Sequence, residues 1–308
     1  MKARRHFPLC LLVGLLCVSV LALVGCSPAA SDTPAPFRIV FVPQTGMEDQ
    51  SVAAFRALQS YLAPRLGRPV EIFQVENANA AMEGLRAGKL DMSNFSPWPY
   101  LMAADKIGVR AILFTHDLDK KPVSYHGVLV TRAGSSLTTP EHLRSQARNV
   151  VFAFEEPVST SGHFVPRVFL HSIGVNPEAD FKQVIYGMDG IANLLAAKSG
   201  RLDVAALSDT SLDRAVAQGR VRAEEFTVLW RSSPVLSTLV AVRTALPAEL
   251  QNQVSALLQN MPVEAPELWA IFRKNFSNPV GGFSPVQPDT LDYFRSAIRT
   301  VPGLADPS

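Results

Sequence analysis

Short apolar runs alternate with segments of helical spacing along most of the chain after about residue 36. The run 37–42 is apolar and rich in β-branched residues, and 52–66 then carries apolar residues three and four positions apart. The first pattern predicts a buried strand and the second an amphipathic helix. Strands that are continuously apolar and are separated by helices are typical of a parallel sheet covered on both faces.

The same alternation occurs twice and predicts two lobes. The first set has strands at 37–42, 70–75, 90–95, 109–114 and 125–131, with helices at 52–66, 78–87 and 97–106. The second set has strands at 149–154, 181–186, 204–207 and 226–230, and helices starting at 139 and spanning 163–173, 190–198 and 211–218. A strand at 236–242 then returns to the first lobe, and helices at 247–259, 266–275 and 290–299 complete that lobe. We expect two doubly wound α/β lobes, 37–130 with 235–308 and 131–234. Two hinge strands would join them, and a ligand would bind at the strand ends.

The N-terminus predicts export and a lipid anchor. Lys2, Arg4 and Arg5 precede an apolar run at 7–24 that ends at Gly25-Cys26. A basic start, a short apolar stretch and a small residue before cysteine form the bacterial lipobox pattern. The alternative is a membrane-spanning helix, because the run approaches the roughly 20 residues that cross a bilayer. We expect a signal peptide at 1–25, lipidation of Cys26 and a flexible tether at 26–36.

Composition narrows the possible functions of the mature part. The three cysteines, Cys10, Cys17 and Cys26, all lie in the N-terminal segment, so the rest of the chain offers no thiol for a disulfide or a thiolate metal site. Removal of residues 1–25 changes the formal net charge from +2 to −1. A nearly neutral body does not favour nucleic-acid binding.

The sequence Ser159-Thr160-Ser161-Gly162 follows a predicted strand and opens a predicted helix. Its hydroxyls and free backbone N–H groups would lie at the positive end of the helix, where an anion is stabilised. The segment therefore predicts an oxyanion site that suits phosphate-like ligands. The simpler interpretation is an ordinary helix cap.

Polar residues also follow other predicted strands. Gln44 follows the first strand, Ser96 the third, and Tyr125 opens the strand that leaves the first lobe. In the second lobe, Asp189 and Asp209 follow strands in the same way. The simpler interpretations are that Ser96, Asp189 and Asp209 cap helices and that Tyr125 is a half-buried strand residue. Beside an anion, the two aspartates could instead select a protonated ligand or an amine.

The sequence carries no recognised motif for catalysis. The histidines of the mature part show no pair at metal-ligand spacing, and no nucleophile elbow, Walker loop or dinucleotide fingerprint occurs. His163 is expected to face solvent or to help hold the anion. Trp98 is expected in the core, with an aromatic wall of the site as the alternative. We predict no catalytic residue, no metal and no cofactor.

The mature chain resembles the periplasmic phosphonate-, phosphite- and phosphate-binding proteins of ABC importers. The similarity rests on 37–43, 55–62, Leu66-Gly67, Pro69-Val70, 84–91, Ser96-Pro97 with Tyr100, Tyr125 with 128–130, 159–162 with Pro166, and 203–206 with Asp209. It implies a two-lobed binding protein of the type II class that closes on its ligand. It also implies that Ser159, Thr160, Ser161 and Tyr125 contact a phosphorus oxyanion.

Two positions depart from the family pattern. Met188 stands where relatives often carry histidine, just before Asp189, and Phe95 stands where some carry tyrosine or tryptophan. Phosphite, phosphate, methylphosphonate and aminoalkylphosphonate stay open as ligands. The resemblance implies a periplasmic, monomeric lipoprotein that delivers its ligand to an ABC permease and its ATPase. A ligand-sensing subunit of a signalling system would need the same receptor, and an enzyme on this scaffold is a third possibility.

Overall fold

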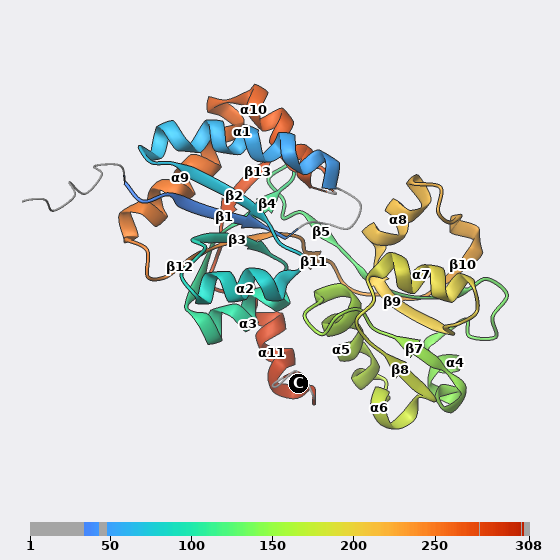
Figure 1. Cartoon of the computed structure of the whole chain (residues 1–308). Coiled ribbons are helices and arrows are strands. Elements are labelled where there is room, and N and C mark those ends of the chain that lie inside the picture. Colours follow the sequence, from blue (N-terminus) through green and yellow to red (C-terminus); the bar gives the residue numbers. More distant parts are fainter. Residues whose placement is uncertain (1–33, 43–47, 277, 303, 305–308) are drawn as a thin grey trace, which may run out of the picture. The chain divides into compact units, whose positions relative to one another are not determined.

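The computed structural model describes residues 34–42, 48–276, 278–302 and 304. The predicted signal peptide, Cys26 and Gln44 lie outside the described residues. Two mixed sheets, each with helices on both faces, and a short two-stranded sheet make up the described part (Figure 1). This arrangement confirms the predicted α/β class with two lobes joined by two strands.

The first sheet has the strand order β13-β4-β12-β3-β1-β2. Its strands are β1 (Phe37–Phe41), β2 (Val70–Gln74), β3 (Met92–Phe95), β4 (Val109–His116), β12 (Leu239–Arg243) and β13 (Gly282–Pro285). β1 pairs in parallel with β2 and β3, whereas β12 pairs antiparallel with β3 and β4. The expected parallel pairing therefore holds for β1, β2 and β3 but not for β12, and β13, which was not predicted, is also antiparallel to its neighbour. The chain leaves this sheet after β4 and returns at the same end, so β12 must run in the opposite direction.

The second sheet has the order β10-β6-β9-β7-β8. Its strands are β6 (Gly127–Arg132), β7 (Val151–Ala153), β8 (Gln183–Ile185), β9 (Val204–Ser208) and β10 (Phe226–Arg231). β7 is parallel to β8 and β9, and β6 is antiparallel to β9 and β10. The division between lobes at 130 and 235 stays a prediction. Because all of β6 pairs with strands of the second sheet, we propose that the first boundary lies near His126 instead.

Two short strands, β5 (Ser124–Tyr125) and β11 (Val235–Leu236), connect the sheets. They pair with each other, with Tyr125 opposite Val235. The sequence predicts one continuous strand at 125–131, but the structure interrupts it at His126. The backbone N–H of His126 donates to Asp209 Oδ1 at 3.0 Å instead of to a strand neighbour, which explains the interruption.

Helices cover both faces of the first sheet. α1 (Glu48–Leu66), α9 (Ala248–Glu264) and α10 (Pro266–Phe272) pack on one face, and α2 (Ala78–Arg86), α3 (Pro97–Ile107) and α11 (Asp292–Thr300) on the other. Ile39 belongs to the first core and Val40 to the second. Successive strand residues point to opposite faces, so a strand buried on both sides must be apolar throughout.

Helices also cover both faces of the second sheet. α4 (Pro140–Ser145) and α5 (Val165–Ser172) contribute to one core, and α7 (Gly190–Lys198) and α8 (Asp209–Ala217) to the other. Shorter turns are α6 (Pro177–Asp180), η1 (Ala147–Asn149), η2 (Thr160–Phe164), η3 (Ala223–Glu225) and η4 (Arg273–Asn275). The sequence analysis did not foresee α6 or β13. The predicted helix at 163–173 is a π turn, η2, followed by α5.

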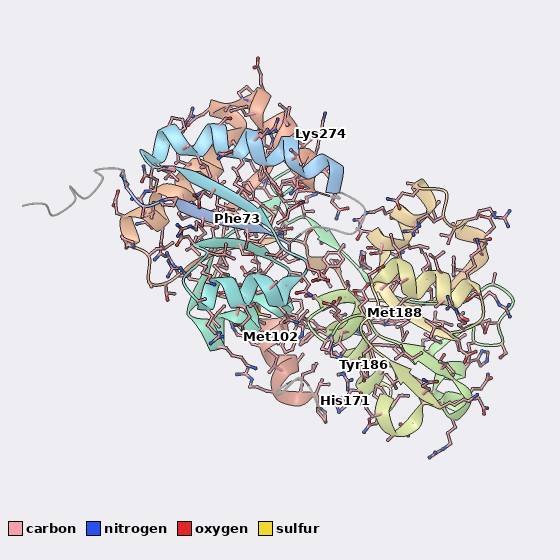
Figure 2. The ribbon with its side chains drawn as sticks, in the orientation of Figure 1. Phe73, Met102, His171, Tyr186, Met188 and Lys274 are labelled. Atoms are coloured by element: carbon pink, nitrogen blue, oxygen red, sulfur yellow. The ribbon has the colours of Figure 1, made fainter. Side chains whose placement is uncertain are left out.

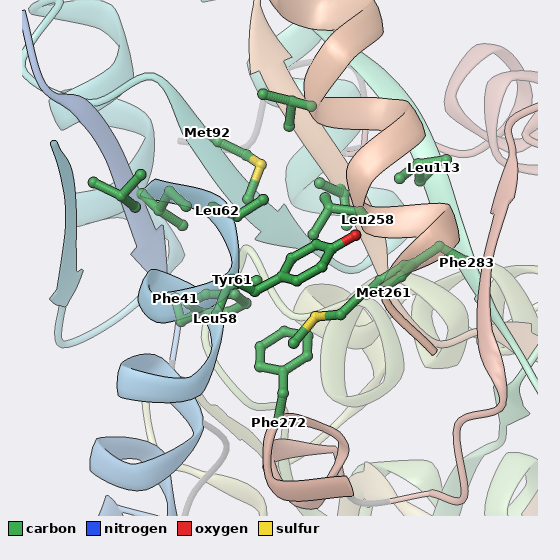
Figure 3. Packing of buried hydrophobic residues seen from close by; sticks show 14 of the residues in the cluster. Phe41, Leu58, Tyr61, Leu62, Met92, Leu113, Leu258, Met261, Phe272 and Phe283 are labelled. Carbon is green, nitrogen blue, oxygen red and sulfur yellow. The ribbon is translucent and has the colours of Figure 1, made fainter. Parts of the chain in front are cut away.

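Tyr61 is fully buried between α1 and α9 (Figure 3). Its hydroxyl donates to the Leu257 carbonyl at 3.0 Å and lies 2.9 Å from Glu264 Oε2. Burial raises the pKa of this phenol to about 12, and the hydrogen bond to Glu264 adds to the shift, so the hydroxyl keeps its proton at neutral pH. The hydroxyl therefore links two helices inside an otherwise apolar core.

We predict that Tyr61→Phe lowers the free energy of unfolding by about 1–2 kcal/mol, because it removes the donor and leaves the Leu257 carbonyl without that partner. Urea denaturation followed by circular dichroism measures the change. Tyr293→Phe is the matched control, since Tyr293 is 56% exposed. Equal stability of Tyr61→Phe and the parent protein would contradict the assigned role.

Candidate functional site

A cavity of about 350 Å³ lies beside the starts of α3, α7, α8 and η2. Most of the residues that line it carry polar side chains. The predicted site residues that line it are Phe95, Ser96, Tyr125, Ser159, Thr160, Ser161 and Asp189. Residues from both lobes therefore meet around one pocket, as expected for a ligand bound at strand ends.

The turn η2 places the three hydroxyls of the Ser-Thr-Ser sequence. Ser159 is the N-cap, and its Oγ accepts a hydrogen bond from Gly162 N at 3.0 Å. Phe164 N donates to Ser159 O at 3.0 Å, which makes this turn wider than an α-helical one. The helix-cap interpretation is confirmed for Ser159. The cap also brings Ser159, Thr160 and Ser161 to the wall of the cavity.

The hydroxyl of Thr160 connects the two lobes. Thr160 Oγ1 accepts from Trp98 N at 3.0 Å and donates to Ser96 Oγ at 2.8 Å. Thr160 is 1% exposed, so both hydrogen bonds are shielded from water. Ser96 begins α3 without using its own side chain as a cap. Ser96 therefore occupies the predicted N-cap position of α3. Its hydroxyl does not cap the helix but accepts the hydrogen bond from Thr160.

Tyr125 reaches the same hydroxyls from β5. Burial raises the pKa of its phenol above the ordinary value, and hydrogen bonding with Ser161 opposes the shift. The phenol therefore keeps its proton at neutral pH and can donate a hydrogen bond. Tyr125 is half-buried, as the simpler interpretation predicts, and it also lines the cavity.

Trp98 belongs to the core, which confirms the main expectation for this residue. It is 2% exposed and does not line the cavity. Its ring centroid lies 4.7 Å from that of Phe164, and its Nε1 donates to the Pro157 carbonyl at 2.9 Å. Phe95 is also buried but does line the cavity, where it adds an apolar surface without a hydroxyl.

The two aspartates occupy different environments. Asp189 caps α7, because its Oδ1 accepts from Ile191 N at 2.8 Å and from Ala192 N at 2.9 Å. The cap prediction is wrong for Asp209, since Ser208 caps α8 and Asp209 is the first helical residue. Asp209 Oδ2 accepts from Arg231 Nη1 at 2.6 Å, and Asp209 does not line the cavity.

The expectation that His163 faces solvent is wrong. His163 is 3% exposed and packs with the rings of Phe154 and Tyr186, at centroid distances of 5.1 and 6.0 Å. Burial lowers its pKa to about 4, helped by the nearby Arg167, so the imidazole is neutral at pH 7. Neither His163 nor Gly162 lines the cavity. Tyr186, whose ring packs beside His163, and Met188, which lines the cavity, both lie in the segment before α7 (Figure 2).

The sequence analysis missed several charged residues of the cavity: Glu76, Glu155, Glu156 and Arg214. Glu155 and Glu156 follow β7 after one intervening residue, and this position beyond the end of a buried strand was the signal that could have found them. Burial raises the pKa of Glu155 to about 7, while its hydrogen bond from Ser159 opposes the shift. The pocket wall thus holds a carboxyl group that titrates near neutral pH.

Among the described residues, the His, Cys, Asp and Glu side chains form no group of three or more placed to hold a metal ion. Every helix in that part of the chain is too short or too polar to cross a bilayer.

Two α/β lobes, two connecting strands and a pocket between strand ends make up the fold of the type II class of periplasmic binding proteins. Residues 39–291 match the family described as "ABC transporter, phosphonate, periplasmic substrate-binding protein". This match covers more than half of the chain. The chain therefore belongs to this family of transport proteins, as the sequence analysis predicted.

Individual relatives are distant. The chain is 24% identical to the phosphonates-binding periplasmic protein of Escherichia coli (strain K12) over 216 residues, which span 68% of this chain and 63% of that protein. It is 24% identical to the phosphate-import protein PhnD of Mycolicibacterium smegmatis over 274 residues, 83% of each chain. The structure of PhnD1 from Prochlorococcus marinus with methylphosphonate has a TM-score of 0.69 at 18% identity. That alignment covers 86% of this chain and 97% of that one, and it shows a shared fold.

The buried His163 predicts a loss of stability in mild acid. Below about pH 6.5 the unfolded chain binds a proton at this residue, whereas folded His163 stays neutral until about pH 4. The contribution of neutral His163 is therefore fully present above pH 6.5 and declines by roughly 2–3 kcal/mol as the pH falls to 4.

Urea denaturation at pH 7 and pH 4.5 tests this prediction. His163→Gln should lose less stability than the parent protein over this interval, because glutamine does not titrate. His171→Gln is the control, since His171 is exposed and should keep the parent pH dependence. An identical pH dependence for the parent and His163→Gln would show that His163 is protonated in the folded state.

Proposed function

We propose that this protein captures a small phosphorus oxyanion, namely a phosphonate, phosphite or phosphate, in the pocket described above and delivers it to an ABC permease. The observation that carries the proposal is the meeting of Ser159, Thr160 and Ser161 with Ser96 and Tyr125 around one cavity. The family resemblance assigns Ser159, Thr160, Ser161 and Tyr125 to ligand binding, and the position of Ser96 after a predicted strand adds its hydroxyl. We include Gln44 among the proposed ligand-binding residues because it follows the first predicted strand. It lies outside the described residues.

The chemistry of these groups suits an oxyanion. Hydroxyls and a protonated phenol can donate hydrogen bonds to several oxygens of a tetrahedral anion, and such charge-assisted bonds are stronger than neutral ones. The start of η2 adds backbone N–H groups at the beginning of a helical segment. Similar ligands occur among relatives, since the proteins from E. coli and M. smegmatis are named for phosphonates and phosphate.

We infer that the pocket binds its ligand without transforming it. The family to which the chain belongs is described as a substrate-binding component of a transporter, which supports this inference. His163 is the histidine nearest in sequence to the serines, and it packs among aromatic rings rather than along the cavity. We therefore propose a transport role with no cofactor and with the permease and its ATPase as partners.

Binding should depend on the hydroxyls of η2. We predict that Ser161→Ala or Thr160→Val weakens binding at least about tenfold, because each change removes a hydrogen-bonding group worth roughly 1–3 kcal/mol beside a charge. Thr160→Val also removes the partners of Ser96 Oγ and Trp98 N. Ser172→Ala is the control, since this exposed serine donates to the Phe169 carbonyl within α5 and does not line the cavity.

Thermal denaturation against phosphate, phosphite, methylphosphonate, 2-aminoethylphosphonate, sulfate and a carboxylate identifies the ligand. A ligand at about one hundred times its dissociation constant adds roughly 2.7 kcal/mol of stability, enough to raise the melting temperature by a few degrees. Calorimetric titration of the variants then gives the loss of affinity. Unchanged affinity in both η2 variants would reject this site, and no shift with any phosphorus anion would reject the ligand class.

We further propose that the protein is held at the periplasmic face of the membrane by a lipid on Cys26, as a monomer. Mass spectrometry of the protein purified from membranes should show an acylated N-terminal Cys26. We predict that Cys26→Ala carries no lipid, because alanine lacks the thiol to which the diacylglycerol is attached. A parent protein without lipid mass on Cys26 would contradict this proposal.

A further inference from the structure

Glu155 lies directly against the hydroxyl-bearing turn. Its backbone N–H donates to the Gly162 carbonyl at 2.9 Å, which fixes the end of β7 beside η2. A Cβ atom at Gly162 would overlap the carboxyl carbon of Glu155, and one at Gly190 would overlap its Oε1. Two glycines therefore leave the space that the carboxyl group occupies.

The carboxyl group competes for the hydrogen of Ser159. Ser159 Oγ donates to Glu155 Oε2 at 2.5 Å while it accepts from Gly162 N at 3.0 Å. A serine hydroxyl has one hydrogen to donate. While that hydrogen points to Glu155, it is not available to a ligand in the cavity that both residues line.

We propose that Glu155 is the residue that couples ligand binding to protonation: it takes up one proton from solvent when an oxyanion binds, and it thereby releases the Ser159 hydrogen to the ligand. The inference rests on the proposed function of this pocket. In the protonated state the Glu155 O–H donates to the free lone pair of Ser159 Oγ, and the Ser159 hydrogen turns to an oxygen of the anion. No covalent bond other than the O–H bond of the carboxyl group forms.

The charges around Glu155 favour this exchange. Asp189 faces it from α7 and Glu156 is its neighbour in the loop, and both raise its pKa. The phenol of Tyr125 on β5 stays neutral. An anion that enters the cavity adds a further negative charge, which raises the pKa of Glu155 again. By linkage, an anion that raises this pKa must bind more tightly as the pH falls.

The sign of the pH dependence follows from the ligand-free pKa of about 7. Below this pH Glu155 already carries the proton, and binding needs no uptake. Above it the proton must be taken from solvent, so the affinity of the parent protein should fall by up to about tenfold for each pH unit. Glutamine at position 155 can donate an N–H to Ser159 at any pH, as the protonated acid does.

Isothermal titration calorimetry of methylphosphonate, phosphite and phosphate at pH 6 and pH 8.5 tests the inference. Repeating each titration in two buffers of different ionisation enthalpy gives the number of protons taken up. Since the ligand itself titrates, the useful quantity is the difference between the parent protein and Glu155→Gln. We expect the parent to take up about one proton more at pH 8.5 and to bind about thirtyfold more weakly than the variant, with equal affinities at pH 6.

Glu156→Gln is the matched control, because this neighbouring carboxylate also lines the cavity but makes no side-chain hydrogen bond to the described part of η2. It should keep the parent proton uptake. Glu155→Ala is a second variant, which should also abolish the uptake. Equal proton numbers for the parent and Glu155→Gln, or loss of the uptake in Glu156→Gln, would overturn the assignment to Glu155. No binding of any of the three anions at either pH would overturn the proposed function itself.

Discussion

The pocket depends on a buried contact between the beginning of α3 in the first lobe and η2 in the second. The rings of Trp98 and Phe164 lie 4.7 Å apart, and Phe164 also contacts Phe294 of α11 at 5.4 Å. This apolar packing shields the hydrogen bonds of Thr160 to Trp98 N and to Ser96 from water, which makes them stronger. The distance between Ser96 and the hydroxyls of η2 therefore follows from how these aromatic rings pack.

Each hydroxyl of the Ser-Thr-Ser sequence has a structural partner as well as a place in the cavity wall. Ser159 caps the turn and bonds Glu155, Thr160 joins the lobes, and Ser161 bonds the phenol of Tyr125. These partners hold the donors in position before a ligand arrives, which reduces the entropy lost on binding. A ligand that accepts hydrogen bonds from these hydroxyls must replace the same protein partners. The hydrogen bonds that preorganise the site therefore also compete with the ligand.

A second layer of side chains, buried at Arg167 and His163 and exposed at Glu178 and Tyr186, packs near the turn. Arg167 forms an ion pair with Glu178, and Tyr186 donates to the same carboxylate. The guanidinium of Arg167 also lies over the ring of Phe154, 5.2 Å from its centroid. Burial opposes the charge of Arg167, but the contact with Glu178 raises its pKa, so the cation persists at only 8% exposure. His163 packs into this layer, which explains why it does not face the ligand cavity.

The sequence by itself determined the two α/β sets, most element positions and the hydroxyl-rich turn, because apolar periodicity and cap residues are local signals. It did not reveal the direction of β12, since an apolar run reads the same whichever way a strand enters a sheet. Only the tertiary structure decided that Asp209 pairs with Arg231, that His163 is buried and that Glu155 bonds Ser159. The Asp209–Arg231 pair joins residues that are distant in sequence, and the other two features depend on the path of the turn η2. Packing of the elements decides such contacts, and local sequence patterns do not record it.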